Sequence, residues 1–404
     1  MTAALLDASL VVLLGVVTVS DLRTRLVPDG PLLASLALAL GLYGLFAPSQ
    51  LPERLAAGAA AAGFLLAAAL IRPDGMGLGD VKLAGVLGSP IAVLVANRDY
   101  PNWDERMNPW PVDADVEETH LPRPGHADLA GLQKFGFTDV RNVLERASAR
   151  ETAARVAAGS IAKGFLDAVG VQVYSHVIQI ASVSAPQRDD LSPEDFEGVD
   201  DSPVRNLDPD VSQTMVEEID RLRQENESLG GRFEVRAFGL VPGIGSHVSG
   251  CEKLDGRLAQ AVCSIQSVKG VSLGEAWDVA GRPGSEAHDE IFWSEDRGWY
   301  RETNRAGGLE GGMTNGEPLL VQAAIKPIST MTQPLRSVDT ETKEPAQAMR
   351  ERTDSTVVPA AAVVAESMVA LVVAAGYREK FGGDHIDDVL SALSAYKERI
   401  GWRR

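Results

Sequence analysis

The sequence predicts an α+β fold preceded by about three apolar, membrane-type helices, and three observations support this prediction. Almost all of the membrane-like composition of the 404 residues lies before residue 72. Beyond it, residues 171–183 (VQVYSHVIQIASV) alternate apolar and polar positions as a half-buried strand does. Residues 141–170 and 254–271 instead have small and apolar residues at helical spacing, and the first run ends at Gly170. Strands and helices therefore follow an apolar N-terminal segment.

The N-terminal segment contains three apolar runs, at residues 3–19, 31–47 and 55–71. Each has about 17 residues, the short end of the length that spans a bilayer core. The first run has neither the basic start nor the small-residue cleavage site of a signal peptide, so we expect it to be retained. The alternative is a buried helical hairpin in a soluble domain.

Basic residues orient these runs. Arg23 and Arg25 follow the first run, and Arg72 follows the third, which places both connections on the cytoplasmic side. Asp21 and Asp80 then lie at the same membrane edge, where two carboxylates can share a proton and activate water. The alternative is that both are helix-terminal caps.

The whole-chain charge and cysteine content restrict the partners. A formal net charge of −18 and a pI near 4.8 argue against a nucleic-acid partner. Two cysteines are too few for a disulfide framework or a thiolate metal site, and they suit a reducing cytoplasm.

Two further helices are predicted in the soluble part. The acidic region 189–231 contains an exposed helix that we expect to end at Gly230. The run that begins at Val357 is apolar over at least 17 residues but contains Glu366, so we predict a buried core helix rather than a fourth span.

Several distant segments combine cations with hydroxyl groups or carboxylates. They are RASARET (146–152), KPIST (326–330) and RERTD (350–354), together with the glycine-rich loop 303–318, which Arg301 precedes. Such groups hold phosphate oxygens, and glycines let backbone N–H groups approach an anion. We expect folding to bring these segments together.

His126 lies in the segment RPGHAD, two residues before the acidic Asp128. An imidazole suits proton transfer near neutral pH, although a single histidine is more often structural.

Two local sequences before residue 88 resemble the paired aspartate motifs of type IV prepilin peptidases. They are SDLRTRLVPD (20–29) and GMGLGDVKLAG (75–85). The resemblance implies that Asp21 and Asp80 form an intramembrane catalytic pair. In that family further apolar helix follows the second aspartate, whereas here the apolar run stops at Asn97.

The remaining chain, from about residue 87 to the end, resembles the chorismate synthases. The matching strings include SPIAVLVANRDYPNW, PRPGHADLAG, LERASARETAARVAAG, RLAQAVCSIQSVKG, NRAGGLEGGMTNGEP and KPIST. The resemblance implies a β-α-β sandwich, a homotetramer, and trans-1,4-elimination of phosphate from 5-enolpyruvylshikimate 3-phosphate to give chorismate. It also implies reduced FMN as cofactor, with NADPH as a reductant only.

The resemblance also assigns roles to residues at matching positions. His126 and Asp354 would be catalytic, and Arg123 and Arg150 would bind the anionic substrate. The implied flavin contacts are Arg146, Ala147, Ser148, Gln266, Ser267, Gly311, Lys326, Pro327, Ile328, Ser329, Thr330 and Arg352.

Chorismate synthases begin with a Gly-Glu-Ser-His-Gly turn and an arginine-rich segment, and neither occurs in residues 1–88. We therefore expect a fusion of a peptidase-like fragment (1–88) with a chorismate synthase domain (89–404) that lacks its N-terminal segment. Its catalytic part would be cytoplasmic, tethered to the inner face of the membrane by residues 1–71, and its turnover reduced or absent. Two alternatives stay open: a membrane leader peptidase, and a fusion product that binds FMN without turnover.

Overall fold

The computed structural model describes residues 93–103, 118–350 and 354–403 of the chain. The chain divides into two compact units, Met1–Asp115 and Val116–Arg404. The fold described below is that of the second unit. The predicted membrane helices, Asp21, Asp80 and Arg352 lie outside the described residues.

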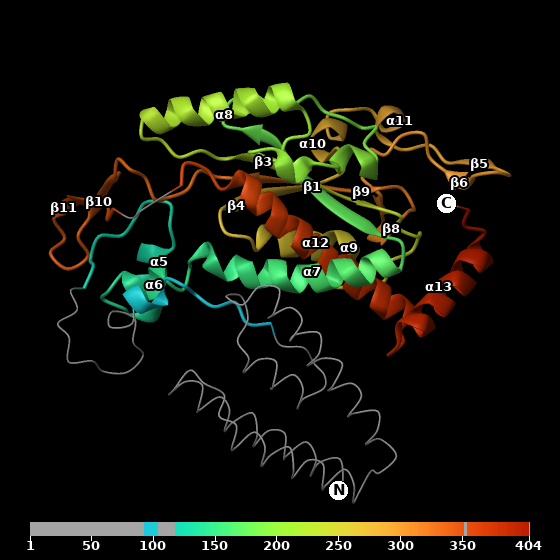
Figure 1. The fold of residues 1–404 in the computed structure, drawn as a ribbon, viewed down its shortest axis with the longest axis horizontal. Helices are drawn as coiled ribbons and strands as arrows, with labels where there is room; N and C mark the ends of the chain where they lie inside the picture. The colour runs from blue at the N-terminus through green and yellow to red at the C-terminus, as the bar shows by residue number, and fades with distance from the viewer. Residues whose placement is uncertain (1–92, 104–117, 351–353, 404) are drawn as a thin grey trace, which may run out of the picture. The chain divides into compact units, whose positions relative to one another are not determined.

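A five-stranded antiparallel sheet forms the centre of the second unit (Figure 1), in the order β2-β1-β3-β9-β4. Its strands are β1 (Gln172–Ile180), β2 (Val183–Ser184), β3 (Gly231–Phe238), β4 (Val268–Leu273) and β9 (Leu319–Ile325). The alternation predicted for residues 171–183 is confirmed as β1 and β2. Apolar residues at every second position of these strands join one hydrophobic core.

Three helices pack together beside the sheet: α7 (Thr152–Ala168), α9 (Leu254–Cys263) and α12 (Val358–Phe381). The α12 helix contacts β1, β3, α7 and α9, so it is the central element of the helical layer (Figure 1). Another helix, α8 (Pro209–Gln224), packs against β1 and β2.

The remaining elements of the second unit are α5 (Asp128–Phe135), α6 (Arg141–Leu144), α10 (Ala276–Val279), α11 (Gly284–Ala287), α13 (Ile386–Ile400), the 3-10 turns η3 (Ala149–Glu151), η4 (Pro193–Phe196) and η5 (Val199–Asp201), and the pairs β5 (Phe292–Ser294) with β6 (Gly298–Tyr300), β7 (Leu309–Glu310) with β8 (Met313–Thr314), and β10 (Arg336–Val338) with β11 (Pro345–Gln347). The described part of the first unit contains the 3-10 turn η2 (Tyr100–Asn102).

The mixed α/β class agrees with the prediction. Within the described ranges there is one large sheet beside the helical layer, and every other sheet has two strands. The second large sheet of a β-α-β sandwich is not among these strands.

The prediction of a buried core helix near the C-terminus is confirmed. Among the described helices, α12 alone is long and apolar enough to cross a membrane, yet 61% of its most apolar window is buried. Its Glu366 accepts hydrogen bonds from Lys163 of α7 and from Ser175 Oγ of β1 (2.7 Å). The carboxylate is thus paired inside the protein, as a buried charge must be.

Three predicted helix boundaries were wrong. The run 141–170 is not one helix, because Ser148 is extended (φ −61°, ψ 136°) and its Oγ accepts from the backbone of Arg150, which starts a new turn. The acidic helix α8 ends at Gln224, before Gly230. The run 254–271 is helical only to Cys263, and its last residues begin β4.

Candidate active site

Five separate segments meet around one cavity of about 640 Å³, within the size range of small-molecule sites. Its lining residues are Arg123, Gly125, His126, Ala127, Leu144, Ala147, Ser148, Ala149, Arg150, Gln266, Ser267, Lys269, Lys326, Ile328, Ser329, Thr330, Asp354 and Val357. The RAS and KPIST segments and Asp354 of RERTD are therefore close in space, as the sequence predicted.

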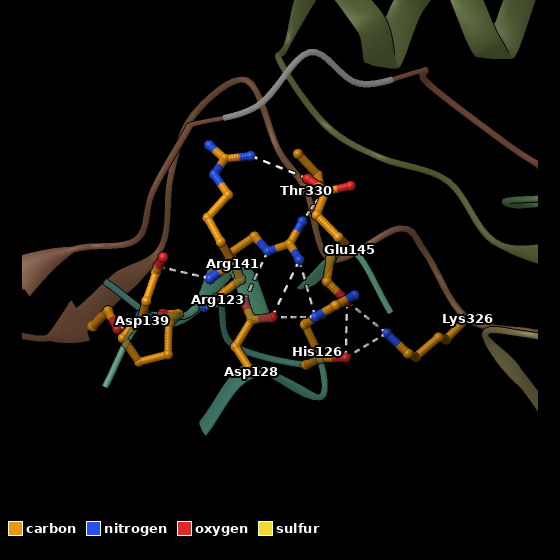
Figure 2. Close-up of polar contacts among 12 residues, drawn as sticks. Arg123, His126, Asp128, Asp139, Arg141, Glu145, Lys326 and Thr330 are labelled. Atoms are coloured by element: carbon orange, nitrogen blue, oxygen red, sulfur yellow. Dashed lines mark hydrogen bonds and ion pairs between the residues drawn. The ribbon is translucent and has the colours of Figure 1, made fainter. Parts of the chain in front are cut away.

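Arg123, His126 and Asp128 form a polar cluster at the edge of this cavity (Figure 2). The Asp128 carboxylate accepts from the Arg123 backbone N–H (3.0 Å) and from Arg123 Nε (2.9 Å). Its other oxygen lies 2.5 Å from His126 Nδ1. Arg123 also donates to Thr330 Oγ1 (2.9 Å), so the cluster is joined to the KPIST segment.

Asp128 is fully buried, whereas the side chain of His126 is 21% exposed. Burial alone would raise the pKa of Asp128, but the hydrogen bonds from His126 and Arg123 hold that pKa well below its ordinary value. The carboxylate is therefore ionised at neutral pH.

Lys326 follows the end of β9 and crosses the cavity to the turn that precedes His126. Its Nζ donates to the Gly125 carbonyl (2.7 Å) and to Ser329 Oγ (2.8 Å). Burial lowers the pKa of Lys326, and the nearby charge of Lys269 lowers it further. An anion bound between the two ammonium groups would relieve this repulsion.

Gln266, which also lines the cavity, follows α9 and donates through Nε2 to Glu151 (2.6 Å). Its carbonyl oxygen Oε1 is buried and has no hydrogen-bond partner among the described residues. An unpaired buried acceptor is costly, so it marks a position where a ligand N–H would bind. The next residue, Ser267, has a left-handed backbone (φ 67°), which is uncommon for serine.

Among the described residues, three of those implied as flavin contacts do not line this cavity. Arg146 lines a neighbouring apolar cavity, and Pro327 packs beside Gly230. Gly311 lies at the turn between β7 and β8, with the rest of the glycine-rich loop, and does not join the RAS and KPIST segments. Arg352 is outside the described residues.

Sequence reasoning had assigned no site role to Lys269 or Asp128. Lys269 has no motif that distinguishes it from other strand lysines, and only its position in β4 brings it to the cavity. Asp128 did have a signal, its spacing from His126.

The arrangement combines cations with a histidine and a carboxylate. Arg123, Arg150, Lys269 and Lys326 can hold an anion such as phosphate, while His126 and Asp354 can exchange protons with the same ligand.

Comparison with known proteins agrees with this geometry. The family model for chorismate synthase matches residues 79–377, and the model for the type IV leader peptidase family matches residues 8–95. The chorismate synthase of Rubrobacter xylanophilus is 52% identical over 324 residues, 80% of this chain and 82% of that protein. The enzyme of Saccharopolyspora erythraea is 51% identical over 328 residues, with 79% and 82% covered.

A crystal structure of chorismate synthase superposes on the chain with a TM-score of 0.60 at 40% identity, covering 68% of this chain and 76% of that one. Sequence, fold and family model agree over the same part of the molecule. The chain belongs to the chorismate synthase family, whose members are lyases.

Proposed function

We propose that the cavity binds reduced FMN together with 5-enolpyruvylshikimate 3-phosphate, and that the reaction is the trans-1,4-elimination of phosphate that gives chorismate. The observation that supports this most is the meeting of His126, Asp354 and four cations from distant segments around one cavity. NADPH would act only as a reductant of the flavin.

The described residues fit a flavin mononucleotide. The buried, unpartnered Gln266 Oε1 is an acceptor suited to an N–H of the ring system. Lys326 and Lys269 suit its phosphate, since within the described part of the chain neither ammonium is paired with a carboxylate and the two repel each other. When bound, reduced flavin supplies electron density to the reaction and recovers it.

The chain's own residues hold the anions and move protons. Departure of phosphate needs cationic stabilisation, which Arg123 and Arg150 would provide, since both line the cavity. With flavin bound, His126 as an imidazolium would supply a proton to it, and Asp354 would accept a proton from flavin or substrate. Each lines the cavity, so each can reach a ligand there.

Turnover should nevertheless be strongly reduced. The Gly-Glu-Ser-His-Gly turn and the arginines that follow it in the family do not occur in residues 1–88. Loss of such phosphate-binding groups costs on the order of several kcal/mol of transition-state stabilisation.

The test is an anaerobic assay of phosphate release from the substrate with reduced FMN, run beside an intact relative and combined with a fluorescence titration of FMN. We expect saturable FMN binding with turnover lower by at least about a hundredfold, the scale of losing one oxyanion-stabilising donor. Turnover equal to that of the relative would contradict the predicted impairment. Absence of FMN binding would contradict the assignment of the cavity.

The match of residues 8–95 to the leader peptidase family supports a second proposal for the N-terminal domain. Residues 1–88 would be a peptidase-like membrane fragment, with Asp21 and Asp80 as its carboxylate pair, and residues 89–404 the chorismate synthase domain. Residues 1–71 would tether the domain to the inner face of the membrane, and the family predicts a homotetramer. If the fragment retains peptidase activity, cleavage of a prepilin leader should be abolished by Asp21→Asn or Asp80→Asn; cleavage that survives both changes would exclude it.

A further inference from the structure

Asp128 lies behind His126 and does not line the cavity itself. It is the first residue of α5 and is fully buried. Its two carboxylate oxygens accept hydrogen bonds from two residues, Arg123 and His126.

Arg123 fixes the orientation of the Asp128 carboxylate. Its backbone N–H and Nε both donate to Oδ2, and its Nη2 lies 3.3 Å from Oδ1. Thr330 accepts from Nη1 of the same guanidinium at 2.9 Å. The carboxylate therefore cannot rotate without breaking several charge-assisted hydrogen bonds.

The short contact between Oδ1 and His126 Nδ1 then determines which ring nitrogen has the proton. The carboxylate is ionised and can only accept, because burial, which alone would raise its pKa, is outweighed by the hydrogen bonds from His126 and Arg123. A lone pair on Nδ1 only 2.5 Å from an anionic oxygen would be repelled, so Nδ1 must donate. The guanidinium Nη2, 2.9 Å from Nδ1, favours the opposite tautomer but does not reach the ring as closely.

With the proton on Nδ1, the lone pair is on Nε2. In the described part of the chain no hydrogen bond involves His126 Nε2, and the His126 ring lines the cavity. The nitrogen available to a ligand is thus the one that Asp128 does not touch.

We propose that Asp128 is a positioning residue, which holds His126 in the tautomer with hydrogen on Nδ1 so that the lone pair on Nε2 takes up the exchangeable proton and passes it to the bound ligand. The assignment of the His126 tautomer follows from the contacts of His126 and does not depend on the proposed function. What the proton exchange serves rests on the proposed function.

The first test measures the tautomer in the unmodified full-length chain. Histidine ¹⁵N chemical shifts distinguish the two tautomers at a pH where the ring is neutral, and His126→Gln identifies the His126 signals among those of the six histidines. We expect the Nδ1–H form to dominate by at least about tenfold, the ratio expected from one hydrogen bond to a charged group. A dominant Nε2–H form, or an even mixture, overturns the inference.

The second test is Asp128→Asn. Two fixed N–H donors of Arg123 face the Oδ2 position, so the amide oxygen should take that position and the NH₂ group should face the ring. The amide then donates to Nδ1, and the dominant tautomer of His126 should switch to Nε2–H. Retention of the Nδ1–H form overturns the positioning role.

Asp139→Asn is the matched control. Asp139 precedes α6, and among the described residues its carboxylate accepts from the backbone N–H groups of Thr119 (3.1 Å) and Arg141 (2.9 Å) and does not contact His126, so the His126 tautomer should not change. If Asp128→Asn does not fold, the measurement on the unmodified chain still decides the inference. Because the shifts are recorded without FMN or substrate, a failure to bind FMN would contradict the proposed function and leave the tautomer result intact.

Discussion

At the scale of single residues, Lys326 connects the turn before His126 with the KPIST segment, and it shares the cavity with Lys269. Its ammonium is held by a carbonyl and a hydroxyl group, neither of which neutralises it. A bound phosphate would do so. We therefore expect the affinity of the cavity for an anion to depend more strongly on Lys326 than on its other lining residues.

Lys326→Met should weaken FMN binding by about tenfold or more, since it removes a charge-assisted hydrogen bond to the phosphate. Isothermal titration with FMN measures this. The control is Lys343→Met, because Lys343 is exposed between β10 and β11 and donates to the Thr340 carbonyl. Equal loss of affinity in both variants would indicate a general charge effect rather than a specific contact.

FMN affinity should also depend on pH through Lys326. Burial and Lys269 lower the pKa of Lys326 from its ordinary 10.5, so the free protein loses this charge at less alkaline pH than an exposed lysine would. The protonated form binds the anion, and affinity should therefore fall as the pH rises through that lowered pKa. Lys326→Met should flatten the plot of FMN affinity against pH. If the plot is unchanged in this variant, another group is responsible for the pH dependence.

Much of the site could be predicted at this scale, because each segment has its own motif. His126, Ser148 and Ser329 line the cavity as expected from the strings that contain them. Arg146 and Gly311 do not, since a motif specifies neighbours along the chain and not the direction of each side chain or the path of a loop. The contact between Arg123 and Thr330 had no local signal at all.

At the scale of elements, α7 and α12 pack closely where Gly159 faces Ser367. A Cβ at Gly159 would lie 2.3 Å from the Cβ of Ser367, which is too close for any real contact, and 2.7 Å from its Cα. A Cβ at Gly164 of the same helix would meet nothing within 4 Å.

Gly159→Ala should therefore lower the free energy of unfolding by about 1–3 kcal/mol, as overpacked cores do. Gly164→Ala should raise it by up to about 1 kcal/mol, because alanine favours the helix. Denaturant unfolding measures both. Equal effects of the two substitutions would show that helix propensity, rather than the approach of α12, determines the cost.

The predicted helix over residues 141–170 shows what composition cannot reveal. Alanine and arginine favour a helix throughout, yet the chain turns at Ser148 because Ser148 Oγ caps the turn that begins η3. That interruption brings Ser148 to the cavity. The core helix α12 was predictable because apolar composition interrupted by one carboxylate indicates burial in protein.

At the scale of the whole molecule, the chain combines matches to two families whose members occupy different environments. We expect the protein to sediment with membranes in fractionated cells and to be released by detergent but not by high salt, since the apolar runs 3–19, 31–47 and 55–71 would anchor it. Deletion of residues 1–71 should move the protein to the soluble fraction. Recovery of the unmodified chain in the soluble fraction would contradict the proposed tether.

The fold class followed from whole-chain patterns, because alternation and helical spacing persist along each segment. The strand order β2-β1-β3-β9-β4 did not, since it pairs β3 with β9 across about 90 residues and no pattern in one sequence encodes that pairing. The two family matches overlap at residues 79–95, around the boundary expected at residue 88.

The hydrogen bond between Arg123 and Thr330 joins residues 207 positions apart. At a translation rate of about 5–20 residues per second, Arg123 waits roughly 10–40 s for its partner to be synthesised. During that interval the guanidinium and the Asp128 carboxylate can pair, but the KPIST segment, which also lines the cavity, has not been synthesised. The cavity proposed to bind flavin is thus completed late in synthesis, and a chain that ends before residue 326 should not bind FMN.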